Sequence, residues 1–200
     1  MINKILYAKH WQLFSLGFGI PMIFQFVFMY SVIAGVNDQG ELDSETFLSF
    51  MQFFPIIIVL SMAVLFGWFW SIAIGLQAKV PENVKMKVGK FKVFFFIPLI
   101  YISLISMLIF IVTQQAAFIA GLFATTASLI PFVLIHFFSM FCIFYVMYFA
   151  AKTLKTVELQ KEVKFSDFVG EFFLLWFFPI GIWFLQPKIN QMMEEGDEFL

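Results

Sequence analysis

The chain has 200 residues, of which 62% are hydrophobic and only 12% carry a charge. With a mean hydropathy of +0.95, this composition predicts an integral membrane protein. It excludes a soluble domain, a basic nucleic-acid-binding module and a disordered tail protein. Cys142 is the only cysteine, so an intramolecular disulfide scaffold is excluded as well.

Four long apolar runs follow one another along the chain. They contain no Asp, Glu, Lys or Arg and cover residues 13–34, 47–76, 93–113 and 129–151. A helix needs roughly 20 apolar residues to cross a bilayer, whereas barrel strands would alternate polar and apolar residues over about ten positions. The sequence therefore predicts an all-α integral membrane protein with four transmembrane helices. The first run exceeds the 7–15 apolar residues of a signal peptide, so we expect it to be retained.

The lysines predict the orientation of the chain. All 12 basic residues are Lys, and 11 of them lie in residues 4–9 before the first run, 79–92 between the second and third runs, or 152–164 directly after the fourth. The alternate loops, residues 35–46 and 114–128, contain none. By the positive-inside rule the N-terminus is cytoplasmic, and we expect a multi-pass protein of the bacterial inner membrane. Trp68, Trp70 and Tyr148 lie near the Lys-rich ends of their runs, where they are predicted to join an aromatic belt at the inner interface.

The predicted organisation has four parts. They are a four-helix transmembrane domain (1–151), a cytoplasmic amphipathic linker helix (152–167), a membrane-associated segment (168–190) and a loose acidic tail (191–200). Ser166 or Asp167 is expected to cap the helix that begins the third part, because Ser and Asp side chains accept hydrogen bonds from the first free backbone N–H groups.

The membrane-associated segment is expected not to cross the bilayer. Its uncharged stretch, residues 172–186, would reach only about 22 Å as a helix, against a hydrocarbon core of roughly 30 Å. Pro179 and Gly181 interrupt it, since proline removes a backbone donor and glycine weakens a helix. We predict an interfacial or re-entrant helix pair with a cytoplasmic C-terminus. A fifth span is the alternative, with residues 168–170 lengthening the run and Glu171 neutral or paired.

Few polar side chains lie in or beside the apolar runs, and such residues are the first places to look for function. The candidates are Gln25, Gln52, His136 and Glu171. For Gln25 and His136, one interpretation is an interhelical hydrogen bond, with His136 buried between helices. The other is the lining of a water-filled path or a protonation switch, because the pKa of histidine lies near 6.5. Glu171 is either a functional carboxylate or a simple interfacial one.

No pattern indicates a metal, a cofactor or catalysis. His10 and His136 are the only histidines, and no spacing places three or four metal ligands together. Gly17 and Gly19 lack the later glycine and lysine of a phosphate-binding loop. His136 and Ser139 have a common i, i+3 spacing that does not identify a catalytic pair. We therefore expect a non-enzymatic protein without a cofactor.

Two Lys-rich segments are candidate contacts for anionic lipid head groups or an acidic partner, at about 1 kcal/mol per residue near the surface. The alternative is that these lysines serve only membrane topology. They are Lys79, Lys85, Lys87, Lys90, Lys92, Lys152, Lys155, Lys161 and Lys164.

Two stretches carry a resemblance. They are GEFFLLWFFPIGIWFLQPKIN (residues 170–190) and AKHWQLF (residues 8–14), about a sixth of the chain. In these stretches the chain resembles small uncharacterised polytopic inner-membrane proteins of Bacteroidota-type bacteria. The resemblance implies no activity.

Two functional hypotheses remain open from the sequence. The first is an accessory or scaffold subunit that contacts the lipid bilayer and another membrane protein or a second copy of itself. The alternative is a small oligomeric channel, transporter or membrane-permeabilising, defence-type effector, in which Gln25, Gln52 and His136 would face a shared pathway.

Overall fold

The computed structural model describes residues 2–36, 44–114 and 126–197, and within these ranges the chain is all-α with no β-strand. This confirms the predicted fold class. Four helical segments are long and apolar enough to cross a membrane, namely His10–Ala34, Gln52–Lys79, Val88–Ile111 and Ile130–Leu159. The two predicted Lys-free loops lie largely outside the described residues.

The first two spans are each interrupted by a π-helical turn. The N-terminal half contains α1 (Ile2–Leu6), α2 (His10–Phe14), the π turn η1 (Ser15–Gly19), α3 (Ile20–Ala34), α4 (Ser44–Trp70), the π turn η2 (Ser71–Gly75) and the 3₁₀ turn η3 (Gln77–Lys79). The C-terminal half contains α5 (Val88–Gln114), α7 (Thr126–Leu159), α8 (Phe165–Trp176) and α9 (Phe178–Asp197). Pro21 lies in the first turn of α3, where its missing N–H costs little.

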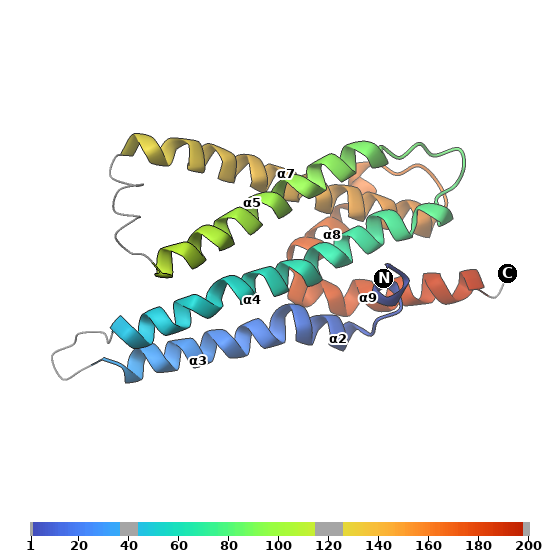
Figure 1. Cartoon of the computed structure of the whole chain (residues 1–200). Coiled ribbons are helices and arrows are strands. Elements are labelled where there is room, and N and C mark those ends of the chain that lie inside the picture. The colour runs from blue at the N-terminus through green and yellow to red at the C-terminus, as the bar shows by residue number, and fades with distance from the viewer. Residues whose placement is uncertain (1, 37–43, 115–125, 198–200) are drawn as a thin grey trace.

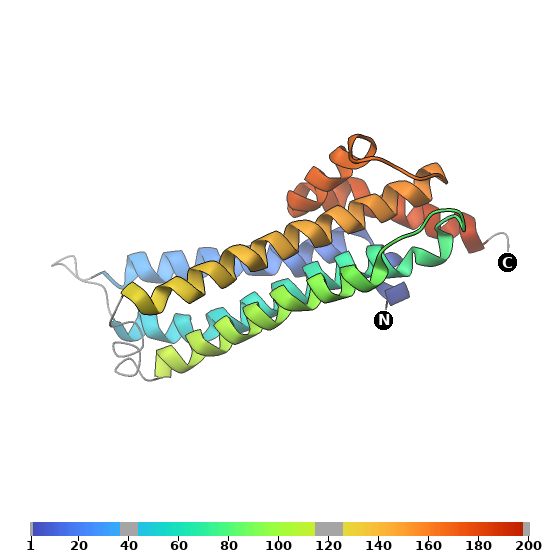
Figure 2. The ribbon, with the colours of Figure 1, turned by 90° about the horizontal axis from the view of Figure 1, so that it is seen from above.

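The four long helices run side by side, and both ends of the chain lie at the same end of the bundle (Figure 1). This is also where α4 ends, α5 begins and α7 ends, so we call it the Lys-rich end. Seen from above, α8 and α9 lie beside the half of the bundle that reaches this end (Figure 2).

The buried core is concentrated in the half of the bundle nearest the Lys-rich end. Its largest fully buried side chains are Trp68, Phe66, Phe69, Phe91, Phe168, Leu6, Ile72, Leu76, Leu154, Leu175, Ile182 and Leu185. Toward the other end large apolar side chains are exposed, as at Ile23, Phe53, Leu104 and Leu134. Lipid tails are as apolar as these side chains, so such faces need no protein cover in a membrane.

Helices α8 and α9 form a hairpin that enters the bundle from the Lys-rich end. Phe177 leaves the helical conformation between them, with φ −86° and ψ 58°. Near the turn, Trp176 and Phe178 line a pocket of about 230 Å³ together with Leu65 and Phe144, which lie near the middle of the second and fourth spans. Neither α8 nor α9 is among the four segments fit to cross a membrane. The structure thus has four candidate spans and a C-terminal helical hairpin, and whether this hairpin is interfacial or re-entrant stays a prediction.

The sequence predicts that the fourth span continues as a helix into the linker, which the structure shows, but this helix ends earlier than residue 167, and residues 191–197 of the predicted loose tail are helical. Residues 152–159 belong to α7, and the helix ends where Gln160 takes a φ of 49°. The Gln160 carboxamide donates to the carbonyl oxygen of Val157 at 2.7 Å, which satisfies a free carbonyl at the helix end. In place of a loose tail from residue 191, α9 continues to Asp197 and buries Met193.

The cap of α8 also lies earlier than predicted. The helix begins at Phe165, and the carboxylate of Asp167 accepts a hydrogen bond from the backbone N–H of Lys164 at 2.8 Å. Asp167 thus acts from inside the first turn, where negative charge also suits the helix dipole.

Candidate functional site

The side chain of Gln186 in α9 joins the two ends of the chain. It is fully buried. Its Oε1 accepts a hydrogen bond from Trp68 Nε1 at 2.7 Å. Its Nε2 lies 3.1, 3.0 and 2.9 Å from the carbonyl oxygens of Ile5, Leu6 and Ala8. One carboxamide therefore binds Trp68 of the second span and the turn between α1 and α2.

Asn190, one helical turn after Gln186, completes this arrangement. Its Oδ1 lies 2.8 Å from Gln186 Nε2, and its Nδ2 donates to the carbonyl oxygen of Ala8 at 3.2 Å. The last carbonyls of a helix have no partner within the helix, and a five-residue helix such as α1 is not stable alone. We call Gln186, Asn190 and Trp68 the glutamine clasp, because they hold α1 to the rest of the protein.

Aromatic contacts reinforce the clasp. The ring of Trp183 lies 4.5 Å from that of His10 and 5.6 Å from that of Phe14, between ring centroids. These contacts join α9 to α2. Trp68 itself is completely buried, so its predicted place in an interfacial aromatic belt is wrong. Its indole reaches a polar partner in the core, which a tryptophan N–H needs when it is buried.

A second polar cluster joins α7, α8 and α9. Lys155 Nζ lies 3.0 Å from Glu158 Oε2 and 3.0 Å from Glu171 Oε1. Lys188 Nζ lies 2.6 Å from the same Glu158 oxygen and 3.2 Å from the same Glu171 oxygen. Each carboxylate thus contacts both ammonium groups. We call these four residues the charge cluster, and its formal charge is zero.

Glu171 is the most buried member of the charge cluster, with 9% of its surface exposed. Burial by itself would raise the pKa of this carboxyl, but hydrogen bonds from Lys155, from its own backbone N–H and from Lys188 outweigh burial and lower the pKa below its usual value. The sequence singled out Glu171, and the structure gives it two basic partners. Its contacts are those of a structural ion pair.

Acid is expected to destabilise the hairpin through Glu171. Because the pKa of Glu171 is lowered on folding, its charge stabilises the protein above the ordinary glutamate pKa of about 4.3, and this contribution is lost as the pH falls through the lowered value. Glu171→Gln should lower stability at neutral pH by roughly 1–3 kcal/mol and flatten the acid dependence. The measurement is the melting temperature in detergent between about pH 7 and pH 3.

Glu82→Gln is the control for this experiment, since Glu82 is an exposed carboxylate in the loop before α5. It should leave the acid dependence of wild type unchanged. Parallel profiles for wild type and Glu171→Gln would contradict the stabilising role of the charge cluster.

The intramembrane polar candidates do not form one site. The Tyr101 hydroxyl lies 3.1 Å from His136 Nδ1, which joins α5 to α7 as an interhelical hydrogen bond. His136 is nevertheless exposed, so its predicted burial is wrong. Gln25 in α3 is exposed and Gln52 in α4 is half-buried, and neither has a hydrogen bond within the described part of the chain.

The candidate lysines differ in their surroundings. Lys79 Nζ donates to the carbonyl oxygen of Met192 at 2.7 Å, and Lys155 belongs to the charge cluster, so both have partners within the chain. Lys152 is half-buried. The remaining six are exposed, namely Lys85, Lys87, Lys90, Lys92, Lys161 and Lys164.

No group of three or more His, Cys, Asp or Glu side chains could hold a metal ion in residues 2–36, 44–114 and 126–197. No protein-family model, curated protein or solved structure matches the chain. The functional argument therefore depends on the side chains themselves. Sequence reasoning missed Gln186 and Asn190, whose only signal was a pair of amides one helical turn apart next to an apolar run.

Proposed function

We propose that the chain is a non-enzymatic accessory or scaffold subunit of the bacterial inner membrane, with its Lys-rich end in the cytoplasm. The lysine distribution supports this orientation. The glutamine clasp and the charge cluster support a scaffold, because their polar groups bond to one another and hold helices together. In this proposal the Lys-rich end is a rigid platform, and the helices beyond it contact a partner.

The first span carries the proposal. Helix α3 has no buried residue, and its side chains at Ile23, Phe26, Tyr30 and Ile33 are 62–74% exposed. Gln25 lies on this helix, exposed and without a hydrogen bond in the described residues. An amide in hydrocarbon favours a partner on a neighbouring helix. We therefore infer that α3 packs against a helix of another membrane subunit, with Gln25 at the contact.

Purification from native membranes in a gentle detergent tests this contact. Wild-type protein is expected to elute with a bound membrane partner, and Gln25→Leu should weaken the association by roughly 3–30-fold, because interhelical hydrogen bonds of this kind contribute about 0.6–2 kcal/mol. Mass measurement and identification of the bound chain are the readouts. They also distinguish a different protein from a second copy.

Met29→Leu is the matched control, since Met29 is exposed on the same helix and the substitution keeps it apolar. It should retain the partner as wild type does. A wild-type protein with the mass of a single chain would contradict the proposal. Liposomes containing the protein should stay tight to ions, and leakage would favour the channel alternative instead.

A further inference from the structure

An aromatic groove lies on the side of α7 where α8 packs. It has a volume of about 460 Å³, within the range of small-molecule sites in proteins. About two helical turns of α7 and two positions of α8 form it. Its lining residues are Phe141, Phe144, Tyr145, Tyr148, Phe165 and Phe172. None of the six is fully buried, because Phe141 and Phe165 are exposed and the other four are half-buried, so the groove opens outward.

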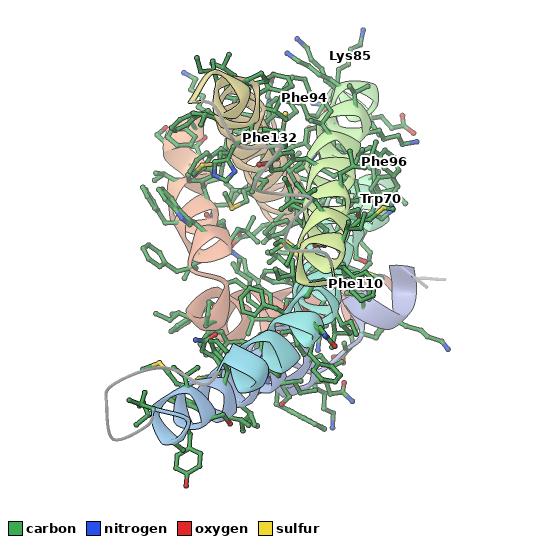
Figure 3. All side chains as sticks on the ribbon, turned by 60° about the vertical axis from the view of Figure 1, so that its left-hand side comes forward. Trp70, Lys85, Phe94, Phe96, Phe110 and Phe132 are labelled. Carbon is green, nitrogen blue, oxygen red and sulfur yellow. The ribbon has the colours of Figure 1, made fainter. Side chains whose placement is uncertain are left out.

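Ring contacts give the groove a continuous aromatic wall. Tyr148 stacks on Tyr145 with centroids 6.2 Å apart, and on Phe165 at 6.1 Å. Phe94 of α5 extends the wall, with its ring 4.7 Å from that of Tyr145. Figure 3 shows Phe94 on the side of α5 that faces α7. The groove thus runs from the interface of α5 and α7 to the outer face of α8.

Two lysines lie at the end of the groove nearest the Lys-rich end. Lys90 Nζ lies 5.5 Å above the ring of Tyr145 and 5.6 Å above that of Phe94. Lys152 follows Tyr148 by one helical turn on the same face of α7. Phe91, the residue after Lys90, stacks on Phe149 of α7 with ring centroids 4.8 Å apart. The start of α5, which carries Lys90, therefore lies beside the part of α7 that leads to Lys152.

Neither lysine is neutralised within the chain. Lys90 is exposed and contacts only aromatic rings, and Lys152 is half-buried with no ion pair in the described residues. The two acidic residues of α8 already have partners, since the carboxylate of Asp167 accepts from the backbone N–H of Lys164 and Glu171 pairs with Lys155 and Lys188. Positive charge therefore meets an apolar groove at one end, which matches the phosphate and acyl chain of a lipid.

We propose that this groove binds one anionic phospholipid, with the phosphate between Lys90 and Lys152 and an acyl chain along Phe141, Phe144 and Phe172. A lipid fits better than a protein segment, because the groove lies along the fourth span at the depth where a membrane presents head groups beside acyl chains. The site does not depend on the subunit role proposed for α3, since its residues come from α5, α7 and α8.

Native mass spectrometry tests the site with phosphatidylglycerol and phosphatidylcholine that carry the same acyl chains, offered in equal amounts to the detergent-purified protein. Wild type should retain one phosphatidylglycerol in preference to phosphatidylcholine. The double variant Lys90→Gln, Lys152→Gln should lower this preference by roughly 30-fold, as expected for two lysines near a membrane surface. Both lysines lie outside the buried core, so the variant should keep the melting temperature of lipid-free wild type.

The control is Lys85→Gln, Lys87→Gln, which removes the same charge from exposed positions in the loop before α5. It should keep the wild-type preference within about twofold. Equal retention of the two lipids by wild type, or equal losses in both double variants, would overturn the proposal. So would stabilisation by inorganic phosphate alone as large as that by phosphatidylglycerol, since the ligand would then be a free anion.

Discussion

Replacing Gly181 with alanine is expected to disrupt the α8–α9 hairpin. Gly181 N–H donates to the carbonyl oxygen of Phe177 at 2.8 Å, at the point where α9 turns back against α8. A Cβ at this position would lie 1.7 Å from the carbonyl oxygen of Leu174 and 2.5 Å from its carbonyl carbon. Backbone atoms cannot rotate away as a side chain can, so the two helices must separate.

The expected loss of stability is about 3 kcal/mol or more, which exceeds the usual cost of overpacking a core. For a chain of this length that corresponds to a fall in melting temperature of roughly 6–12 °C in detergent. Proteases should also cleave this variant faster than wild type at sites within α8 and α9. A Gly181→Ala protein with the wild-type melting temperature would show that α9 does not pack this closely against the backbone of Leu174.

Gly170→Ala is the matched control. Gly170 is also a helical glycine of the hairpin, but it is exposed and a Cβ there meets nothing within 4 Å. Alanine loses less backbone entropy than glycine on folding, so this variant should be unchanged or more stable by about 0.5–1 kcal/mol. The two alanine variants therefore separate a steric effect from a general effect of removing glycine.

Gln186→Leu is expected to release the N-terminal segment. Leucine has a similar volume but no polar atom, so Trp68 Nε1 and the carbonyl of Leu6 lose their partner. The carbonyls of Ile5 and Ala8 keep the hydrogen bonds from Ala8 N–H and Asn190 Nδ2. Each buried polar group left without a hydrogen bond costs about 1–3 kcal/mol, and detachment of α1 would let its carbonyls reach water. We expect a loss of about 3 kcal/mol and faster cleavage by a lysine-specific protease at the N-terminal lysines.

Gln77→Leu provides the comparison. Gln77 Nε2 donates at 2.6 Å to Ala73 O, a carbonyl of the preceding turn, so its loss frees no distant partner. Cleavage at Lys4 and Lys9 should then stay at the wild-type rate. If Gln186→Leu and Gln77→Leu behave alike, the glutamine clasp does not hold the N-terminus.

The sequence predicted the four candidate spans and a break in the C-terminal apolar segment, because both depend on local properties. A run of uncharged residues sets the length of a span, and Pro179 with Gly181 marks an apolar stretch too short and too interrupted to cross. The start of α8 was missed by two or three residues, because Asp167 caps from the third position of the helix. The last turns of α9 were missed because their support comes from Lys79, more than 110 residues away in sequence.

The glutamine clasp and the charge cluster could not be predicted either, because their residues are far apart in the sequence. Glu171 could be singled out as a charge beside an apolar run, but its partners Lys155 and Lys188 are 16 and 17 residues away on other helices. Gln186 bonds to backbone carbonyls, which every residue has, so the sequence does not indicate which residues are its partners. His136 shows the converse error, since its hydrogen bond was foreseen and its exposure was not.

The glutamine clasp has a consequence for biosynthesis. Gln186 and Asn190 bond to carbonyls that precede them by 178 to 182 residues. A ribosome adding about 5–20 residues per second needs on the order of 10–35 s to cover that distance. Through this interval the first span is already made while the carbonyls of α1 lack their partners in α9, so the Lys-rich end of the bundle closes only when translation is nearly complete.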